Sequence, residues 1–225
     1  MVSPFRNRRD AGRRLAAELR MYANRSDVIV LALPRGGVPV GYEVATALDV
    51  PLDVFVVRKL GLPWHEEVAM GALASGGVRI LNDDLIRVAR VSTDDIERIT
   101  AAEQVELERR ERTYRGDRAL PDLTGKTVLL VDDGLATGST MRAAVAALRH
   151  KGPHRIIVGV PVAAPETCDA FRDIADDIVC VVTPEPFRAV GLWYEDFSQT
   201  TDEEVHELLV QAGVPRGSRR LAGQT

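Results

Sequence analysis

Two adjacent aspartates, Asp132 and Asp133, are the residues of this sequence best placed to do chemistry. They follow the apolar run Val128–Val131, which predicts a buried strand that carries both carboxylates at its carboxyl end. Open α/β sheets bind their ligands at this edge. Ionised carboxylates are strong hydrogen-bond acceptors and repel phosphate, so the pair suits the hydroxyl groups of a sugar.

The residues that follow the acidic pair favour a phosphate. Two glycines and three hydroxyl side chains precede a predicted helix, and the backbone N–H groups of such a turn form an anion site with the helix N-terminus. The segment contains Gly134, Ala136, Thr137, Gly138, Ser139 and Thr140. Adjacent sites for hydroxyl groups and for a phosphate monoester together describe a ribose 5-phosphate. Helix capping alone would not require so many polar residues in one short stretch.

Two common nucleotide-binding motifs are excluded. A Walker A loop needs a glycine five residues before its Gly-Lys-Thr, and Gly125–Thr127 lacks that glycine and lies before the strand. The GxGxxG fingerprint of dinucleotide-binding domains is absent from the sequence. The acidic pair therefore belongs to another kind of site.

Alternating strands and helices are expected to position this site. The chain has 225 residues, of which 45% are hydrophobic and 28% charged, so it can bury a sizeable core. Strands are predicted at 28–33, 52–57, 128–131, 155–161 and 178–182, and helices at 8–22, 38–48, 83–89, 92–114, 137–148, 165–174 and 202–211. This order predicts an α/β domain with a mainly parallel sheet. Ser75–Gly77, between two short apolar stretches, predicts a hairpin.

Charge, cysteine spacing and the lack of long apolar runs indicate which classes of protein this chain does not belong to. The net charge of −4 argues against a protein that coats nucleic acid. Cys168 and Cys180 lie twelve positions apart without metal-ligand spacing, so we expect neither a disulfide nor a CxxC site. No secretory signal or membrane helix is expected, which favours a reduced, cytoplasmic, soluble protein. Residues 1–212 are predicted to form a single domain and residues 213–225 a disordered tail.

Asp132–Thr140 resembles the 5-phosphoribosyl-1-pyrophosphate (PRPP) motif of type I phosphoribosyltransferases, in which two acidic residues precede Thr-Gly-x-Thr. The order of elements over Val28–Asp196 agrees, and the chain is most similar to uncharacterised bacterial members of that family. The resemblance implies a three-layer α/β fold with a mainly parallel sheet, one antiparallel strand and a small hood at about 184–200. It also implies transfer of the 5-phosphoribosyl group from PRPP to a nitrogen acceptor, with release of pyrophosphate.

The resemblance further assigns roles to the residues of the motif. Thr137–Thr140, with Ala136, would bind the 5′-phosphate. Asp132 and Asp133 would hold the ribose hydroxyls and act as catalytic residues. Mg²⁺ is the expected cofactor, held mainly through PRPP, and the same two aspartates are the candidate protein ligands.

Two further segments lie at predicted strand ends and carry cations. The turn with Arg35, Gly36 and Gly37 resembles the family's pyrophosphate loop, which often contains a cis peptide bond before a residue other than proline. Arg58 and Lys59 end the second predicted strand, where they would neutralise departing pyrophosphate. The alternatives are an ordinary strand-to-helix turn and an ordinary charged strand end. Arg35 and Lys59 are the catalytic candidates among these cations.

The acceptor is predicted from an aromatic segment near the C-terminus. Phe187, Val190, Trp193 and Asp196 are expected to bind a planar base, because the segment resembles the base-recognition segment of purine enzymes. The alternative is a small packed cluster of aromatic side chains. Ala136 occupies the position of an aspartate in six-oxopurine enzymes, so the base stays open, with a purine-like ring favoured by its larger stacking area.

Two questions of function are left open by the sequence. The loop Gly61–Val68 corresponds to the family's mobile lid, and it is a second place where an acceptor could bind. The chain could also be a non-catalytic PRPP sensor or regulator on the same fold. A repressor is disfavoured, because only about 25 residues precede the first predicted strand, fewer than a helix-turn-helix module needs. The expected partners are PRPP, a nucleobase-like acceptor and a second copy of the chain, without nucleic acid or membrane.

Overall fold

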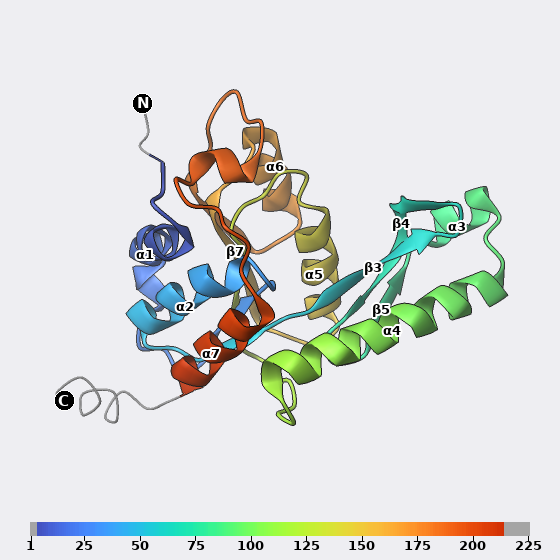
Figure 1. The fold of residues 1–225 in the computed structure, drawn as a ribbon, viewed down its shortest axis with the longest axis horizontal. Coiled ribbons are helices and arrows are strands. Elements are labelled where there is room, and N and C mark those ends of the chain that lie inside the picture. The colour runs from blue at the N-terminus through green and yellow to red at the C-terminus, as the bar shows by residue number, and fades with distance from the viewer. Residues whose placement is uncertain (1–3, 214–225) are drawn as a thin grey trace.

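A parallel sheet of five strands forms the centre of the computed structural model, which describes residues 4–213 (Figure 1). The strands lie in the order β2-β1-β6-β7-β8, and every neighbouring pair is parallel. Their bounds are β1 (Val28–Ala32), β2 (Leu52–Val54), β6 (Thr127–Val131), β7 (Arg155–Val162) and β8 (Asp177–Val182). All five strands therefore end at one edge of the sheet, where the site lies.

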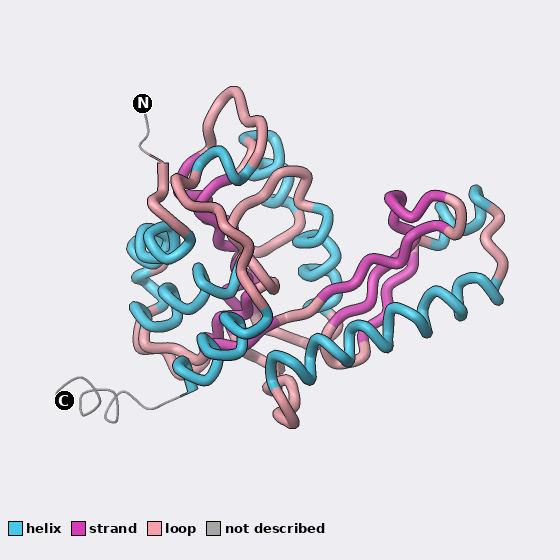
Figure 2. The backbone as a smooth tube through the Cα atoms, in the orientation of Figure 1, coloured by secondary structure: helices cyan, strands magenta, loops and turns pink. Residues whose placement is uncertain are grey.

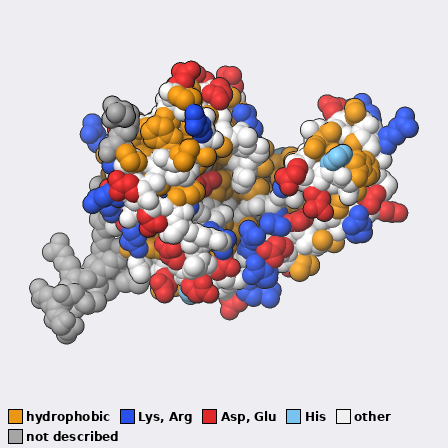
Figure 3. All heavy atoms as spheres, turned by 45° about the horizontal axis from the view of Figure 1, so that its top comes forward, with side chains coloured by type: hydrophobic (Ala, Val, Ile, Leu, Met, Phe, Trp, Pro, Cys, Tyr) orange, Lys and Arg blue, Asp and Glu red, His pale blue; other side chains and the backbone are white. Residues whose placement is uncertain are grey.

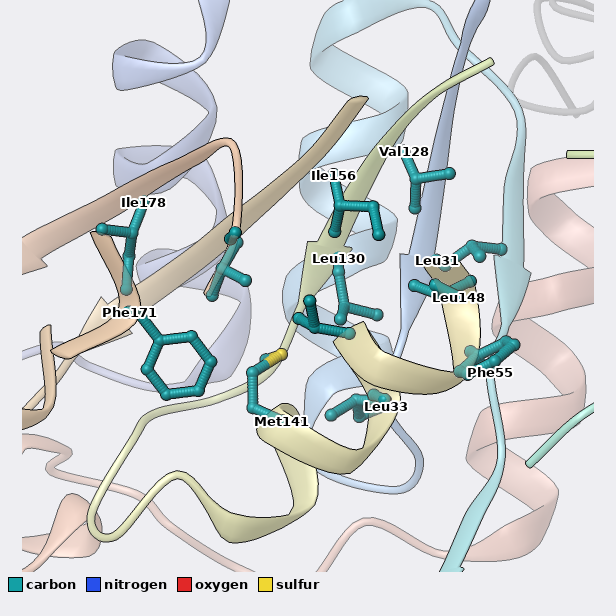
Figure 4. Packing of buried hydrophobic residues seen from close by; sticks show 14 of the residues in the cluster. Leu31, Leu33, Phe55, Val128, Leu130, Met141, Leu148, Ile156, Phe171 and Ile178 are labelled. Carbon is teal, nitrogen blue, oxygen red and sulfur yellow. The ribbon is translucent and has the colours of Figure 1, made fainter. Parts of the chain in front are cut away.

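Helices cover both faces of this sheet. Helices α1 (Arg8–Glu18) and α2 (Gly37–Leu48) pack on one face, and α5 (Ser139–Arg149) and α6 (Pro165–Ala170) on the other. Successive side chains of β1 alternate between the two cores, because neighbouring residues of a strand point to opposite faces. Figure 4 shows Met141 of α5 below Leu130 of β6, and Leu148 of α5 beside Leu31 of β1.

A second, antiparallel sheet forms an arm that extends from this body (Figures 1 and 2). It consists of β3 (Val57–Leu62), β4 (His65–Ala74) and β5 (Val78–Leu81), with α3 (Asp83–Ala89) and the long helix α4 (Thr93–Arg115). Ser92 caps α4 by accepting from the Asp95 amide at 3.1 Å. The molecular surface is hollowed between the body and the arm (Figure 3).

The last helix, α7 (Asp202–Gly213), joins the body to the arm. Its buried residues Val205, Leu208 and Leu209 share one hydrophobic cluster with Leu107 and Tyr114 of α4. Three short 3-10 helices, Arg20–Tyr22, Phe171–Asp173 and Val190–Trp193, complete the described elements.

The α/β fold with a mainly parallel sheet is confirmed, and the differences from expectation lie in the arm. The strand expected at 52–57 divides in two, because Phe55 donates to the Ala32 carbonyl and Val56 to the Ser75 hydroxyl as the chain leaves the central sheet. The loop expected at 61–68 is the tip of the β3–β4 hairpin, and the hairpin at 75–77 joins β4 to β5. The antiparallel strands thus form their own sheet, whereas the resemblance implied one antiparallel strand. The predicted tail falls, from residue 214 onward, outside the described residues.

The expectation for the two cysteines was wrong. Cys168 of α6 and Cys180 of β8 form a disulfide, with their Cα atoms 6.9 Å apart. The reason is topological: α6 connects β7 to the adjacent strand β8 and packs over the sheet, so residues on the helix and on the strand come together despite the absence of a spacing motif. Within residues 4–213, no helix is long and apolar enough to cross a membrane.

Candidate active site

The two aspartates lie half-buried directly after β6. Asp132 Oδ1 accepts from the backbone amide of Asp133 at 2.8 Å, and Asp133 Oδ2 accepts from Arg8 Nε at 2.8 Å. Burial raises the pKa of the Asp132 carboxyl well above its ordinary value, and the charge of Asp133 raises it further. Burial also raises the pKa of Asp133, while Arg8 opposes that rise. The pair therefore places two poorly solvated carboxyl groups side by side, where they can accept hydrogen bonds from a ligand.

The loop between β1 and α2 packs directly on this pair. A Cβ at Gly36 would lie 2.0 Å from Asp133 Oδ2, and one at Gly37 would lie 2.8 Å from the Val131 carbonyl oxygen. Gly36 has ordinary right-handed backbone angles, so the glycine is required here for space. The Pro34–Arg35 peptide bond is cis, as the resemblance implied.

The expected 5′-phosphate loop joins β6 to α5 on the other side of the aspartates. Its base is fixed by the Leu135 amide, which donates to the Val162 carbonyl at 2.9 Å, and by the Thr167 hydroxyl, which donates to the Ala136 carbonyl at 2.6 Å. Gly138 has a left-handed backbone conformation (φ +70°), which favours glycine. Thr137 and Ser139 place their exposed hydroxyls 3.1 Å apart at the start of α5. The backbone amides and hydroxyls there can bind a phosphate.

Arg58 and Lys59 are neighbours on β3, and both line a cavity of about 410 Å³ between the β3–β4 hairpin and α4. Arg58 forms an ion pair with Glu103 of α4 at 2.6 Å, away from α5. Lys59 lies 3.3 Å from Glu67 and lines a narrow cavity of about 80 Å³ together with Ser139 and Thr140. Lys59 thus also reaches the cavity beside the start of α5, which Arg58 does not line.

Arg35 lies beside the arm and the last helix. Its guanidinium is 3.8 Å from Asp202 Oδ1, and the Tyr114 hydroxyl donates to that same oxygen at 2.8 Å. Burial raises the pKa of Tyr114 to about 12, so the phenol stays a hydrogen-bond donor. Arg35 is thus held where α4 and α7 meet the turn after β1.

The aromatic segment at 184–200 covers the top of the body in Figure 1. Phe187, Val190 and Trp193 are partly buried against a small cluster that contains Phe5 and Tyr194. Val190 is also the nearest neighbour of Gly134 in the loop after the aspartates, at 2.6 Å from a Cβ placed there. The exposed carboxylate of Asp196 accepts from the Ser198 amide at 2.9 Å. Of the expected base-binding residues, Val190 thus lies against the loop that follows the acidic pair, and Phe187 and Trp193 pack the hood.

Sequence reasoning missed two residues that contact the acidic pair. Arg8 binds the Asp133 carboxylate, and the Tyr194 hydroxyl donates to the Asp133 carbonyl at 2.6 Å. Burial raises the pKa of Tyr194, which keeps its proton. Arg8 is 125 positions from Asp133, so no local motif reports the contact, and it was hidden among the other N-terminal arginines.

Asp132→Asn should stabilise the ligand-free protein at neutral pH. The unfolded carboxyl ionises near 3.8, whereas the folded one resists ionisation, so the wild type loses stability as the pH rises above that value toward the folded pKa. Asparagine is neutral throughout and keeps an oxygen for the Asp133 amide. We expect the melting temperature to rise by about 2–4 °C at pH 7, or ~1 kcal/mol, with a smaller difference at pH 4. Thermal melts at both pH values measure this, and a constant difference would contradict the charge explanation.

The parallel sheet thus presents an acidic pair at the end of β6, between the β1–α2 turn and the hydroxyl-rich start of α5. Residues 4–192 match the family model described as the phosphoribosyl transferase domain, and the chain belongs to this family.

Relatives and solved structures agree with this assignment. Two curated proteins named "Putative phosphoribosyl transferase", from two strains of Mycobacterium tuberculosis, are 43% identical over 208 residues, or 92% of this chain. The chain spans about half the length of these relatives (47%). The crystal structure of TT1426 from Thermus thermophilus is 40% identical with a TM-score of 0.83, covering 94% of this chain and 100% of that one. AQ2163 from Aquifex aeolicus, 14% identical with a TM-score of 0.50, covers 82% of this chain and 78% of its own and shares the fold.

Proposed function

We propose that this chain transfers the 5-phosphoribosyl group of PRPP to a ring nitrogen of a purine-like base and releases pyrophosphate. The observation that carries the proposal is the contact of three elements at one sheet edge. The acidic pair lies between the pyrophosphate loop, where a Cβ at Gly36 would overlap Asp133, and the hydroxyl-rich start of α5. A ribose with phosphate groups on both ends fits this order of sites.

Each site has a distinct part in the proposed reaction. Asp132 and Asp133 hold the two ribose hydroxyls and favour the positive charge that develops at C1′ as its bond to pyrophosphate breaks. The electron pair of that bond leaves with pyrophosphate, whose charge Arg35 and Lys59 offset. The new bond forms between C1′ and the base nitrogen, and the nitrogen's proton passes to water. The hydroxyls of Thr137–Thr140 keep the 5′-phosphate in place throughout.

The residues present fit a Mg²⁺ ion that is bound mainly by substrate. The half-buried Asp132 carboxylate, whose ionisation is opposed by burial and by the charge of Asp133, would gain from a nearby cation. Residues 4–213 hold no group of three or more His, Cys, Asp or Glu side chains that could bind a metal ion. Asp132 and Asp133 are the proposed protein ligands. Mg²⁺ keeps several waters and favours phosphate oxygens, and when bound it would neutralise the pyrophosphate.

The acceptor is proposed from the hood. Val190 lies beside the loop after the aspartates, and Phe187 and Trp193 offer aromatic surface on the same segment. The hairpin tip at 61–68, the other candidate, lies at the far end of the arm in Figure 1. Trp193→Ala and Phe187→Ala should raise the acceptor KM, and an unchanged KM in both would move the acceptor away from the hood.

Calorimetry with Mg²⁺ and PRPP, followed by a nucleobase screen for pyrophosphate release, tests the function. We expect binding by the wild type, and strongly weakened binding by Asp132→Asn with Asp133→Asn. Absence of binding by the wild type would refute the proposal. Tight binding without turnover on any base would instead favour a PRPP sensor on the same fold. Size-exclusion chromatography with light scattering would test the homodimer expected from the family resemblance.

A further inference from the structure

Arg8 is a nearly buried side chain at the edge of the candidate active site, and it contacts both the acidic pair and the hood. Its side chain is 11% exposed, and its Nε donates to Asp133 Oδ2 at 2.8 Å. The Nη1 group donates to the Ser198 carbonyl at 2.6 Å, and the guanidinium carbon lies 3.9 Å from the centre of the Phe197 ring. A single side chain thus connects a ribose-site carboxylate to the hood.

The backbone beside Arg8 is paired with the same part of the hood. The Phe5 amide donates to the Trp193 carbonyl at 2.8 Å, and the Glu195 amide returns to the Phe5 carbonyl at 2.8 Å. The Asp196 amide then donates to the Arg6 carbonyl at 3.0 Å. Residues 5–8, which we call the N-terminal strap, therefore run along residues 193–198 and end at Asp133.

The surroundings of Asp133 show why a guanidinium is needed there. The carboxylate is confined by Gly36, so it has little room to turn, and Arg8 Nε itself lies 3.2 Å from a Cβ placed on Gly36. A fork of donors can bind a carboxylate and a carbonyl together, which a point charge does less well. Arg8 Nε binds the Oδ2 atom of Asp133. The Oδ1 atom accepts no side-chain hydrogen bond within the described residues, so it is the oxygen that can accept from a ligand.

We propose that Arg8 is a positioning residue of the site: it orients the Asp133 carboxylate toward the ribose hydroxyls and ties the hood to that carboxylate. The inference rests on the proposed function. Through Arg8 the N-terminal strap becomes part of the active site. Binding of PRPP at Asp133 therefore changes the surroundings of Trp193. Arg8 acts through Asp133 and the hood, without contacting the reacting atoms.

Arg8→Met tests the first half of the proposal. Methionine keeps much of the side-chain volume and removes the donors, so we expect the dissociation constant for Mg·PRPP to rise at least tenfold by calorimetry. Arg8→Lys should recover part of the affinity. The matched control is Arg9→Met, because Arg9 also pairs with a carboxylate (Glu43, 3.3 Å) and stacks on a ring (Tyr42, 5.3 Å) but lies away from the site.

Tryptophan fluorescence tests the second half. The chain has two tryptophans, so a Trp64→Phe background leaves Trp193 as the reporter. Saturating Mg·PRPP should change Trp193 emission in this background and with Arg9→Met, and the change should be lost with Arg8→Met. A thermal melt of each variant shows the temperature range in which it is folded, and binding and fluorescence are measured within that range.

The outcomes separate the two proposals. Failure of the wild type to bind Mg·PRPP would overturn the proposed function and this inference together. Binding by the wild type with affinity within twofold for Arg8→Met would overturn the orienting role alone, even if that variant melts earlier. An unchanged Trp193 response in Arg8→Met would overturn the link to the hood.

Discussion

Gly36→Ala is expected to weaken PRPP binding about 100-fold, or ~2.8 kcal/mol, while the protein stays folded. The backbone angles at Gly36 (φ −59°, ψ −32°) suit alanine, so the chain itself is not strained by the change. The new Cβ would lie 2.0 Å from Asp133 Oδ2 and 2.7 Å from its Cγ, which no real contact allows. The Asp133 carboxylate must turn away. It then loses its hydrogen bond to Arg8 and its orientation toward the ribose hydroxyls.

Calorimetry with Mg·PRPP measures this effect, and circular dichroism checks the fold. Gly213→Ala is the matched control, because a Cβ at Gly213 meets nothing within 4 Å and the residue lies at the end of α7. The control should bind PRPP as the wild type does. Wild-type affinity in Gly36→Ala would show that Asp133 can move without cost, and would remove the packing argument for its role.

Local patterns were sufficient to predict the central part of the fold and the place of the acidic pair at a strand end. The apolar runs that became β1, β6 and β7 are buried on both faces, and this leaves little choice but a parallel sheet. The acidic pair and the loop after it are contiguous in sequence, so their position at a strand end followed from the strand alone. The cis bond at Pro34–Arg35 was implied only by the resemblance to a family.

Contacts between distant segments could not be predicted in this way. Arg58 and Lys59 are neighbours in sequence, and only the packing of β3 against α4 and α5 shows that Arg58 pairs with Glu103 while Lys59 lines the cavity beside the start of α5. The pairing of Cys168 with Cys180 depends on the packing of α6 over β8. Arg8 needs both the strap and the hood to reach Asp133.

Arg115 shows the same dependence on distant contacts at the base of the arm. Its side chain is 3% exposed and forms ion pairs at 2.8 Å with both Asp53 and Glu111. The same guanidinium donates to the Val54 carbonyl and, at 3.3 Å, to the Ser75 hydroxyl. These are the points where the chain passes between the central sheet and the arm. Arg115 thus anchors the arm that carries Lys59.

Arg115→Met is therefore expected to lower the free energy of unfolding by about 3–5 kcal/mol, because it leaves Asp53 buried without its cation. Urea denaturation measures this. The control, Arg98→Met on the same helix, breaks an exposed pair with Asp95 and should cost under about 1 kcal/mol. Adding Asp53→Asn to Arg115→Met should restore part of the loss, since no buried charge then remains unpaired. If both methionine variants cost the same, the ion pair does not hold the arm, and the position of Lys59 must be fixed by the packing of α4 and α7 alone.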